Sequence, residues 1–329
     1  MDENLKRILK YLLIFLLVVG IGYVIYKLVE LWGSVKNVLN AFKVAWFNTR
    51  YCGQKECNPP AETLDPPLPS TINTNEWDQN LARYVADGVY KIASAATDKV
   101  DPVAPADLTI IKELYNNKDD PIFGLILSGG GAIWILFRGT QTASELIQDI
   151  TYSQDGYLKP QDTSQVKIKF LTKEGEKEPA VHAGFIEAYE NMRQDILDTL
   201  ESANLDKTTQ SIVVGGHSLG AAVATLAGAD LKQQGYKSVV VYASASPRVG
   251  DQTLCDIITK MNLILFRIVN TADAIPTFPP AVSPNFKDIN SPYDYAHCGI
   301  LKAFSNNWLS TLNNHMLGNY MQALLEMTL

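Results

Sequence analysis

The chain has 329 residues, of which 47% are hydrophobic and 19% charged, so most of it can bury a core. Its formal net charge is −7, which argues against nucleic-acid binding because that function needs a basic face. We therefore expect one or two folded domains and no nucleic-acid partner. The oligomeric state is left open.

An almost wholly apolar segment lies near the N-terminus, from Ile8 to Leu28. About 20 apolar residues are enough to cross a bilayer. A cleavable signal peptide is the alternative, but no A-x-A-like cleavage site follows the segment. We therefore predict an N-terminal transmembrane helix within residues 1–32 and a single-pass membrane protein. Basic residues are similar in number on both sides of residues 8–28, so the side of the membrane that holds the rest of the chain is undetermined.

Residues 33–70 form a predicted connecting segment. Apolar residues at helical spacing over 33–47 indicate either an amphipathic helix lying on the membrane or a continuation of the anchor. Five prolines between Asn58 and Ser70 are typical of a semi-rigid extended linker. We therefore expect the main folded domain to cover residues 71–329.

Strand-like and helix-like segments alternate from Thr71 onward. Helical periodicity predicts helices over residues 77–93, 182–202, 218–233, 253–261 and 313–327. Apolar runs predict strands over residues 123–128, 132–137, 166–171, 211–215, 238–243 and 264–269. The glycines at 129–131 predict a hairpin between the first two strands. Continuous apolar strands between helices predict a mostly parallel central sheet with helices on both faces.

The four cysteines give no clear metal site. Cys52 and Cys57 either form a local disulfide or remain free thiols, and no further ligands for zinc lie near them. Cys255 falls in a helical pattern and is expected to be a small buried hydrophobe. With no metal-ligand cluster in the sequence, we expect no cofactor.

The strongest functional motif is Gly216-His217-Ser218-Leu219-Gly220, a G-x-S-x-G sequence between a predicted strand and a predicted helix. In this context the motif is typical of a nucleophile elbow, where small residues allow a tight turn that exposes the serine hydroxyl. A glycine-rich turn that binds phosphate is the alternative, but the chain has no G-x-G-x-x-G or G-K-[ST] sequence. We predict that Ser218 is a nucleophile and that the Leu219 N–H stabilises an oxyanion.

In hydrolase sheets of this kind the acid and then the base follow the serine in chain order. Asp273 follows the strand predicted over 264–269, at the sheet edge where open α/β sheets hold their sites. The alternative role for Asp273 is to cap a turn. Asp251 and Asp256 are weaker candidates for the acid. The base is His315 or His297, and position along the chain favours His315.

The segment after the strand predicted over 132–137 reads Arg138-Gly139-Thr140-Gln141. An early strand followed by a loop of small residues is where a second oxyanion donor belongs. We predict that Thr140 supplies this donor, and it can also act as the N-cap of a following helix.

At this point the chain resembles the class 3 lipases, the group of fungal triacylglycerol lipases and feruloyl esterases. Six motifs match in order over about residues 71–329. They are Phe137 to Thr140, Val181 to Phe185, Gly216 to Ala221, Ser246 to Asp251, Asn270 to Pro280, and His315 with Tyr320. The resemblance implies an α/β-hydrolase fold and a serine ester hydrolase. It also implies Ser218, Asp273 and His315 as the catalytic triad and Thr140 and Leu219 as oxyanion donors.

The resemblance does not fix the substrate. The segment from Gln141 to Asp155, which would form the lid, has no Trp and several polar residues, as in the esterase branch of the family. We expect a membrane-anchored lipase or carboxylesterase acting on acylglycerols or related esters. The alternatives are an acyltransferase that uses the same triad and a non-catalytic lipid-binding module of the same fold.

Overall fold

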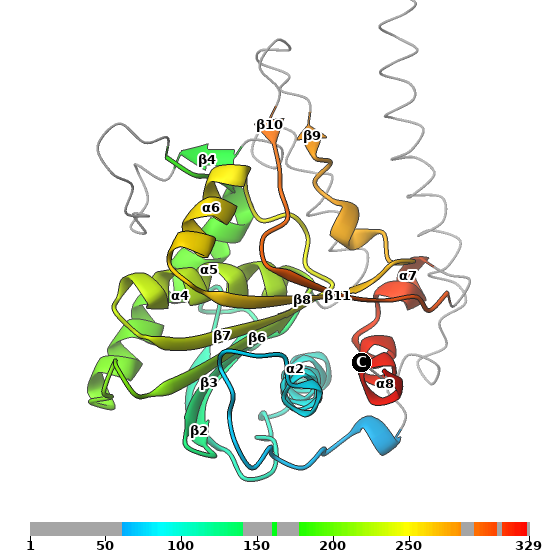
Figure 1. Ribbon diagram of the computed structural model, residues 1–329. Helices are drawn as coiled ribbons and strands as arrows, with labels where there is room; N and C mark the ends of the chain where they lie inside the picture. Colours follow the sequence, from blue (N-terminus) through cyan, green and yellow to red (C-terminus); the bar gives the residue numbers. More distant parts are fainter. Residues whose placement is uncertain (1–60, 141–159, 163–177, 284–292, 308–310, 328–329) are drawn as a thin grey trace, which may run out of the picture. The chain divides into compact units, whose positions relative to one another are not determined.

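The computed structural model describes residues 61–140, 160–162, 178–283, 293–307 and 311–327, all within one compact unit, Tyr51–Leu329. Its centre is a seven-stranded sheet in the order β1-β2-β3-β6-β7-β8-β11 (Figure 1). The strands are β1 (Thr109–Leu114), β2 (Gly124–Gly129), β3 (Ala132–Phe137), β6 (Ser211–His217), β7 (Ser238–Ser244), β8 (Ile264–Asn270) and β11 (Ile300–Phe304). β1, β2 and β3 pair antiparallel, whereas β3, β6, β7, β8 and β11 pair parallel. The predicted mostly parallel sheet is therefore confirmed.

Helices cover both faces of the sheet (Figure 1). On one face lie α4 (Ala183–Ser202), α5 (Leu219–Gln233) and α6 (Gln252–Lys260), and on the other lie α2 (Gln79–Asp98) and α8 (Leu317–Glu326). Strand β6 shows how the sequence builds this arrangement, because successive side chains of a strand point to opposite faces. Ile212 and Val214 join the cluster with α4 to α6, and Val213 joins the cluster with α2 and α8.

Shorter elements lie around this core. They are the 3-10 helices η1 (Ala61–Thr63) and η3 (Ile275–Thr277), the pair β4 (Pro160–Asp162) and β5 (Ala180–His182), and the pair β9 (Val282–Ser283) and β10 (Tyr293–Asp294). Part of the predicted linker also packs on the domain. Leu64 and Leu68 contact the cluster around α2, and the Asp65 N–H donates to the buried Asp87 carboxylate over 3.2 Å.

The predicted hairpin is confirmed as β2 and β3. Gly130 and Gly131 have φ values of +62° and +76° at its turn, a conformation that glycine adopts without steric cost. The two outermost strands, β1 and β11, were not predicted. Both are edge strands with several exposed positions, and their polar residues interrupt the apolar run that reveals a central strand.

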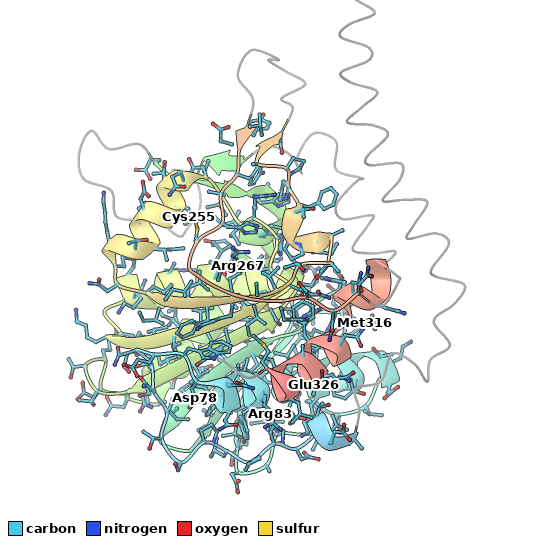
Figure 2. The ribbon with its side chains drawn as sticks, turned by 45° about the vertical axis from the view of Figure 1, so that its right-hand side comes forward. Asp78, Arg83, Cys255, Arg267, Met316 and Glu326 are labelled. Atoms are coloured by element: carbon cyan, nitrogen blue, oxygen red, sulfur yellow. A yellow bond between two sulfur atoms is a disulfide. The ribbon has the colours of Figure 1, made fainter. Side chains whose placement is uncertain are left out.

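The predicted helix over 313–327 is two helices instead. α7 (Thr311–His315) ends at His315, Met316 is extended with φ −63° and ψ 134°, and α8 starts at Leu317. Figure 2 shows Met316 at the junction of the two helices. Met316 and its two neighbours are neither glycine nor proline, so the helical periodicity of the sequence continues across the break. The break leaves His315 at a helix end, outside the regular packing of α8.

Cys255 is buried, as predicted, with 5% exposure, but its disulfide was not predicted from the sequence. Cys255 on α6 forms a disulfide with Cys298, which lies 43 residues further along the chain between β10 and β11. Sequence spacing does not reveal a pairing of this length, because the fold alone brings the two segments together. Cys52 and Cys57 lie outside the described residues.

Several other predicted segments also fall outside the described residues: the apolar run at 8–28, the helix at 33–47, the strand at 166–171 and the whole lid segment at 141–155. Among the helices that the structure does describe, none is both long and apolar enough to cross a bilayer.

The disulfide predicts a measurable loss of stability. Closing a loop of 43 residues restricts the unfolded chain by about 4 kcal/mol in the chain-entropy model. We expect the double variant Cys255→Ser, Cys298→Ser to lose about 2–4 kcal/mol of unfolding free energy in urea titrations. Thiol counting should find no reactive thiol from this pair in unfolded, unreduced wild type. A reactive Cys255 or Cys298 there would contradict the pairing.

Candidate active site

Ser218 occupies the sharp turn between β6 and α5. Its φ of 58° and ψ of −123° lie in a region that residues with a side chain rarely adopt. A backbone hydrogen bond to the neighbouring strand holds the turn: the Ser218 N–H donates to the carbonyl of Ser244 at the end of β7 over 3.0 Å. This is the strained strand-to-helix turn predicted from the G-x-S-x-G sequence.

The glycines of the motif are required by close backbone contacts. A Cβ atom on Gly216 would lie 2.2 Å from the carbonyl oxygen of Gly220, and one on Gly220 would lie 2.3 Å from the carbonyl oxygen of Arg138. No side chain fits at such distances. The first turn of α5 thus packs directly against β6 and against the residue that follows β3.

The predicted triad residues are brought together in one hydrogen-bonded chain. His315 Nε2 lies 2.9 Å from Ser218 Oγ, and His315 Nδ1 lies 2.8 Å from Asp273 Oδ2. Since the carboxylate accepts, Nδ1 carries the proton and Nε2 accepts from the serine hydroxyl. All three residues are buried, with 2%, 7% and 3% exposure for Ser218, His315 and Asp273.

Two further donors orient the Asp273 carboxylate. The Ile275 N–H donates to Oδ1 over 2.9 Å, and the Tyr320 hydroxyl donates to Oδ2 over 2.8 Å. Burial and the nearby Asp273 charge raise the pKa of Tyr320 well above its usual value, so the phenol stays protonated and remains a donor. Tyr320 itself accepts from the Asn270 N–H over 3.1 Å, which ties α8 to the end of β8.

Asn270 was not predicted to contribute beyond its place in the acid-loop motif. Its side chain is fully buried and bonds three segments. Oδ1 accepts from the N–H groups of Ala272 and Asn306 over 3.2 and 3.0 Å. Nδ2 lies within donating distance of the carbonyls of Asn306 and Asn314, at 2.8 and 3.2 Å. Asn270 therefore joins the acid loop to the segment that carries His315.

His217 and His297, the other histidines after β5, have positioning contacts. The two ring nitrogens of His217 contact Ser244 and His315, and its Nε2–H donates to the carbonyl of His315 over 2.8 Å. Burial, reinforced by the neighbouring His315, lowers the pKa of His217 well below its usual value. His297 donates from Nε2 to the carbonyl of Pro276 over 2.7 Å, and burial near two arginines lowers its pKa to about 4. His315 is the histidine that reaches Ser218.

The two predicted oxyanion donors flank the nucleophile. Leu219 is the first residue of α5, so its N–H has no partner within the helix and points out of the helix N-terminus. Thr140 follows Gly139, which lies against the turn: a Cβ on Gly139 would be 3.1 Å from Ser218 Cβ. The described residues contain no group of three or more His, Cys, Asp or Glu side chains that could hold a metal ion.

The serine, histidine and aspartate are linked in this order at the carboxyl ends of a mostly parallel sheet. This arrangement is a Ser-His-Asp site on an α/β-hydrolase fold. The family model described as lipase (class 3) matches residues 134–283. Over these residues, a little under half of its length, the chain is similar to the class 3 lipases.

Known relatives agree with this assignment. Secreted mono- and diacylglycerol lipase A of Penicillium cyclopium is 44% identical over 96 residues, covering 29% of this chain and 31% of that protein. The lipase of Rhizomucor miehei is 28% identical over 200 residues, covering 58% and 49%. The chain spans about a third of the length of the first curated relatives that it matches. A solved Rhizomucor miehei lipase propeptide complex shares the fold, with a TM-score of 0.53 at 21% identity over 75% of this chain and 77% of that one.

The single-pass membrane localisation predicted from the sequence is contradicted. Relatives from Penicillium cyclopium and Fusarium solani are named as secreted lipases, and the helices that the structure describes include no membrane span. The physical reason for the error is that apolarity marks a segment that can enter a bilayer without distinguishing a lasting anchor from a targeting segment. The membrane localisation is therefore withdrawn.

The glycine contacts predict a sharp difference between two substitutions. We expect Gly220→Ala to lower the unfolding free energy by at least about 2–3 kcal/mol, because its Cβ would overlap backbone carbonyl oxygens. Gly184→Ala is the matched control, since its Cβ would meet only the His182 ring at 3.5 Å. In helix α4 that alanine should be neutral or stabilise by up to about 1 kcal/mol. Urea unfolding measures both, and equal effects would contradict the packing of the elbow.

Proposed function

We propose that this protein is a serine ester hydrolase that cleaves acylglycerols or related carboxylic esters through an acyl-enzyme on Ser218. The observation that carries the proposal is the continuous hydrogen-bonded chain from Ser218 through His315 to Asp273. The match of residues 134–283 to the lipase (class 3) family model supports the same reaction class.

In the first half-reaction His315 takes the Ser218 proton on Nε2 while Oγ attacks the ester carbonyl. Asp273 keeps the imidazole in the tautomer with a proton on Nδ1 and stabilises the imidazolium that forms. The imidazolium then gives its Nε2 proton to the leaving alcohol. In the second half-reaction His315 activates water, which releases the acid and restores Ser218.

The tetrahedral intermediates carry a negative charge on the former carbonyl oxygen. We propose the N–H groups of Leu219 and Thr140 as its hydrogen-bond donors. Two features support this assignment: Leu219 opens α5, where the helix dipole favours negative charge, and Gly139 brings the loop after β3 against Ser218. Removing one oxyanion donor typically costs about 10²–10³ in rate.

The substrate class is proposed from the relatives. The protein of Penicillium cyclopium is named a mono- and diacylglycerol lipase, and an acylglycerol ester fits a site that offers general base, nucleophile and oxyanion donors. We propose residues 71–329 as the catalytic domain, with residues 61–70 docked on it.

Replacing the nucleophile tests the proposal. We expect Ser218→Ala to lower kcat on a soluble p-nitrophenyl ester by at least about 10⁴-fold, because triad members act as a unit. A fluorophosphonate probe should label wild type and leave Ser218→Ala unlabelled. Ser246→Ala is the matched control: Ser246 is as buried as Ser218, and its hydroxyl donates to the carbonyl of Pro247. Wild type that neither labels nor hydrolyses esters would overturn the enzyme assignment in favour of a non-catalytic module.

A second measurement identifies the acyl acceptor. With a diacylglycerol substrate and added glycerol as a competing alcohol, we expect free fatty acid to remain the main product, because water resolves the acyl-enzyme. The products can be separated by chromatography at several glycerol concentrations. If acyl transfer to glycerol dominated at millimolar concentrations, where water is in vast excess, the protein would be an acyltransferase using the same triad.

A further inference from the structure

We propose that Arg138 is a positioning residue for the oxyanion hole, which it serves by fixing and polarising the peptide between Gly139 and Thr140. The inference rests on the proposed function, because it concerns the N–H that we assign to the oxyanion. Nothing in the sequence pattern indicates this role, since an arginine just after a strand is most often a surface residue.

Arg138 is buried, with only 6% exposure. Its Nη1 donates to the carbonyl oxygen of Gly139 over 2.7 Å, and its Nε donates to the carbonyl oxygen of Ile122 over 2.5 Å. The guanidinium also lies over the ring of Phe123, with 5.4 Å from its carbon to the ring centroid. A planar fork held by two carbonyls and an aromatic face has little freedom to move.

The carbonyl of Gly139 belongs to the same peptide unit as the N–H of Thr140. Because that unit is planar and trans, its C=O and N–H point in opposite directions. A guanidinium that fixes the direction of the Gly139 oxygen therefore also fixes the direction of the Thr140 N–H. The bond is charge-assisted, and polarising the carbonyl strengthens the N–H at the other end of the peptide as a donor.

Gly139 is also confined by the nucleophile turn. A Cβ on Gly139 would lie 3.0 Å from the carbonyl oxygen of His217 and 3.1 Å from Ser218 Cβ. The backbone is held as well, since the Arg138 N–H donates to the carbonyl of Phe123 over 2.9 Å. The donor peptide is thus clamped between the arginine and the nucleophile, which sets the distance from the Thr140 N–H to a group bound on Ser218.

The experiment compares Arg138→Lys and Arg138→Gln with wild type on a soluble p-nitrophenyl ester. Lysine keeps the charge but loses the planar guanidinium, and glutamine keeps only a neutral amide NH2 group as donor. We expect kcat to fall about 10- to 100-fold in Arg138→Lys and further in Arg138→Gln. KM should stay within about threefold, because the contact acts on the transition state. The midpoint of the pH–rate profile should not move, because the His315–Asp273 contact is untouched.

A transition-state analogue separates positioning from general loss of structure. The affinity for a trifluoromethyl ketone, which forms an oxyanion adduct on the serine, should fall by the same factor as kcat/KM. Arg193→Lys is the matched control: it disturbs a second arginine, half-buried, whose Nε lies 2.7 Å from Asp230 on α5. We expect that control to lose stability in urea unfolding while keeping wild-type kcat.

Each outcome decides between the two proposals. The role of Arg138 would be overturned if both variants kept kcat within twofold of wild type, or if only their KM rose. Either result would leave the hydrolase assignment intact. An inactive wild type that binds no ketone would overturn both. If one Arg138 variant fails to fold, the other carries the measurement. If neither folds while Arg193→Lys does, the arginine is structural and the inference fails.

Discussion

The backbone of Ser218 is the constraint on which the rest of the site depends. A residue with a side chain at positive φ costs about 1–3 kcal/mol and persists only where its surroundings hold it. Here the Ser218 N–H is bound to the end of β7, and the glycines on either side allow the strand and helix to touch. The turn aims the hydroxyl at His315 and places the first N–H of α5 beside it. Acid, base and oxyanion loop are each positioned relative to this one point.

The site contains a carboxylate with almost no access to water, and a second layer of polar residues compensates for its burial. Asp273 accepts from His315, Tyr320 and the Ile275 N–H, so its charge is solvated by protein donors rather than water. Tyr320 stays protonated because its pKa is raised, and Asn270 fixes the loop on which this carboxylate lies. The electrostatic environment of the base is therefore built in before substrate binds, which is the condition for efficient proton transfer.

A feature of this protein can be predicted from the sequence when it depends on residues close together in the chain, and not when it depends on contacts between distant segments. The elbow, the β2–β3 hairpin and the buried strands follow from local patterns, and each was placed within one or two residues. The order of Ser218, Asp273 and His315 follows from chain topology. The break at Met316, by contrast, leaves no local signal, and the partner of Cys255 lies 43 residues away. Asn270 and His217 likewise act through contacts that exist only once the sheet has formed. The membrane prediction failed for a different reason: an apolar composition indicates that a segment can enter a bilayer, but does not show whether it is a lasting anchor.

The loop after β3 combines both kinds of feature: its place in the chain is visible in the sequence, whereas the contacts that set its geometry are not. Its position after an early strand makes Thr140 the proposed oxyanion donor, and in our proposal the strength of that donor depends on the opposite end of its peptide bond. There the Arg138 guanidinium binds the carbonyl oxygen, and the segment before β2 holds the guanidinium. In the role that we propose for Arg138, its charge acts through this rigid peptide on the oxygen that becomes negative. The buried cation then carries a desolvation cost in the resting protein and stabilises the transition state.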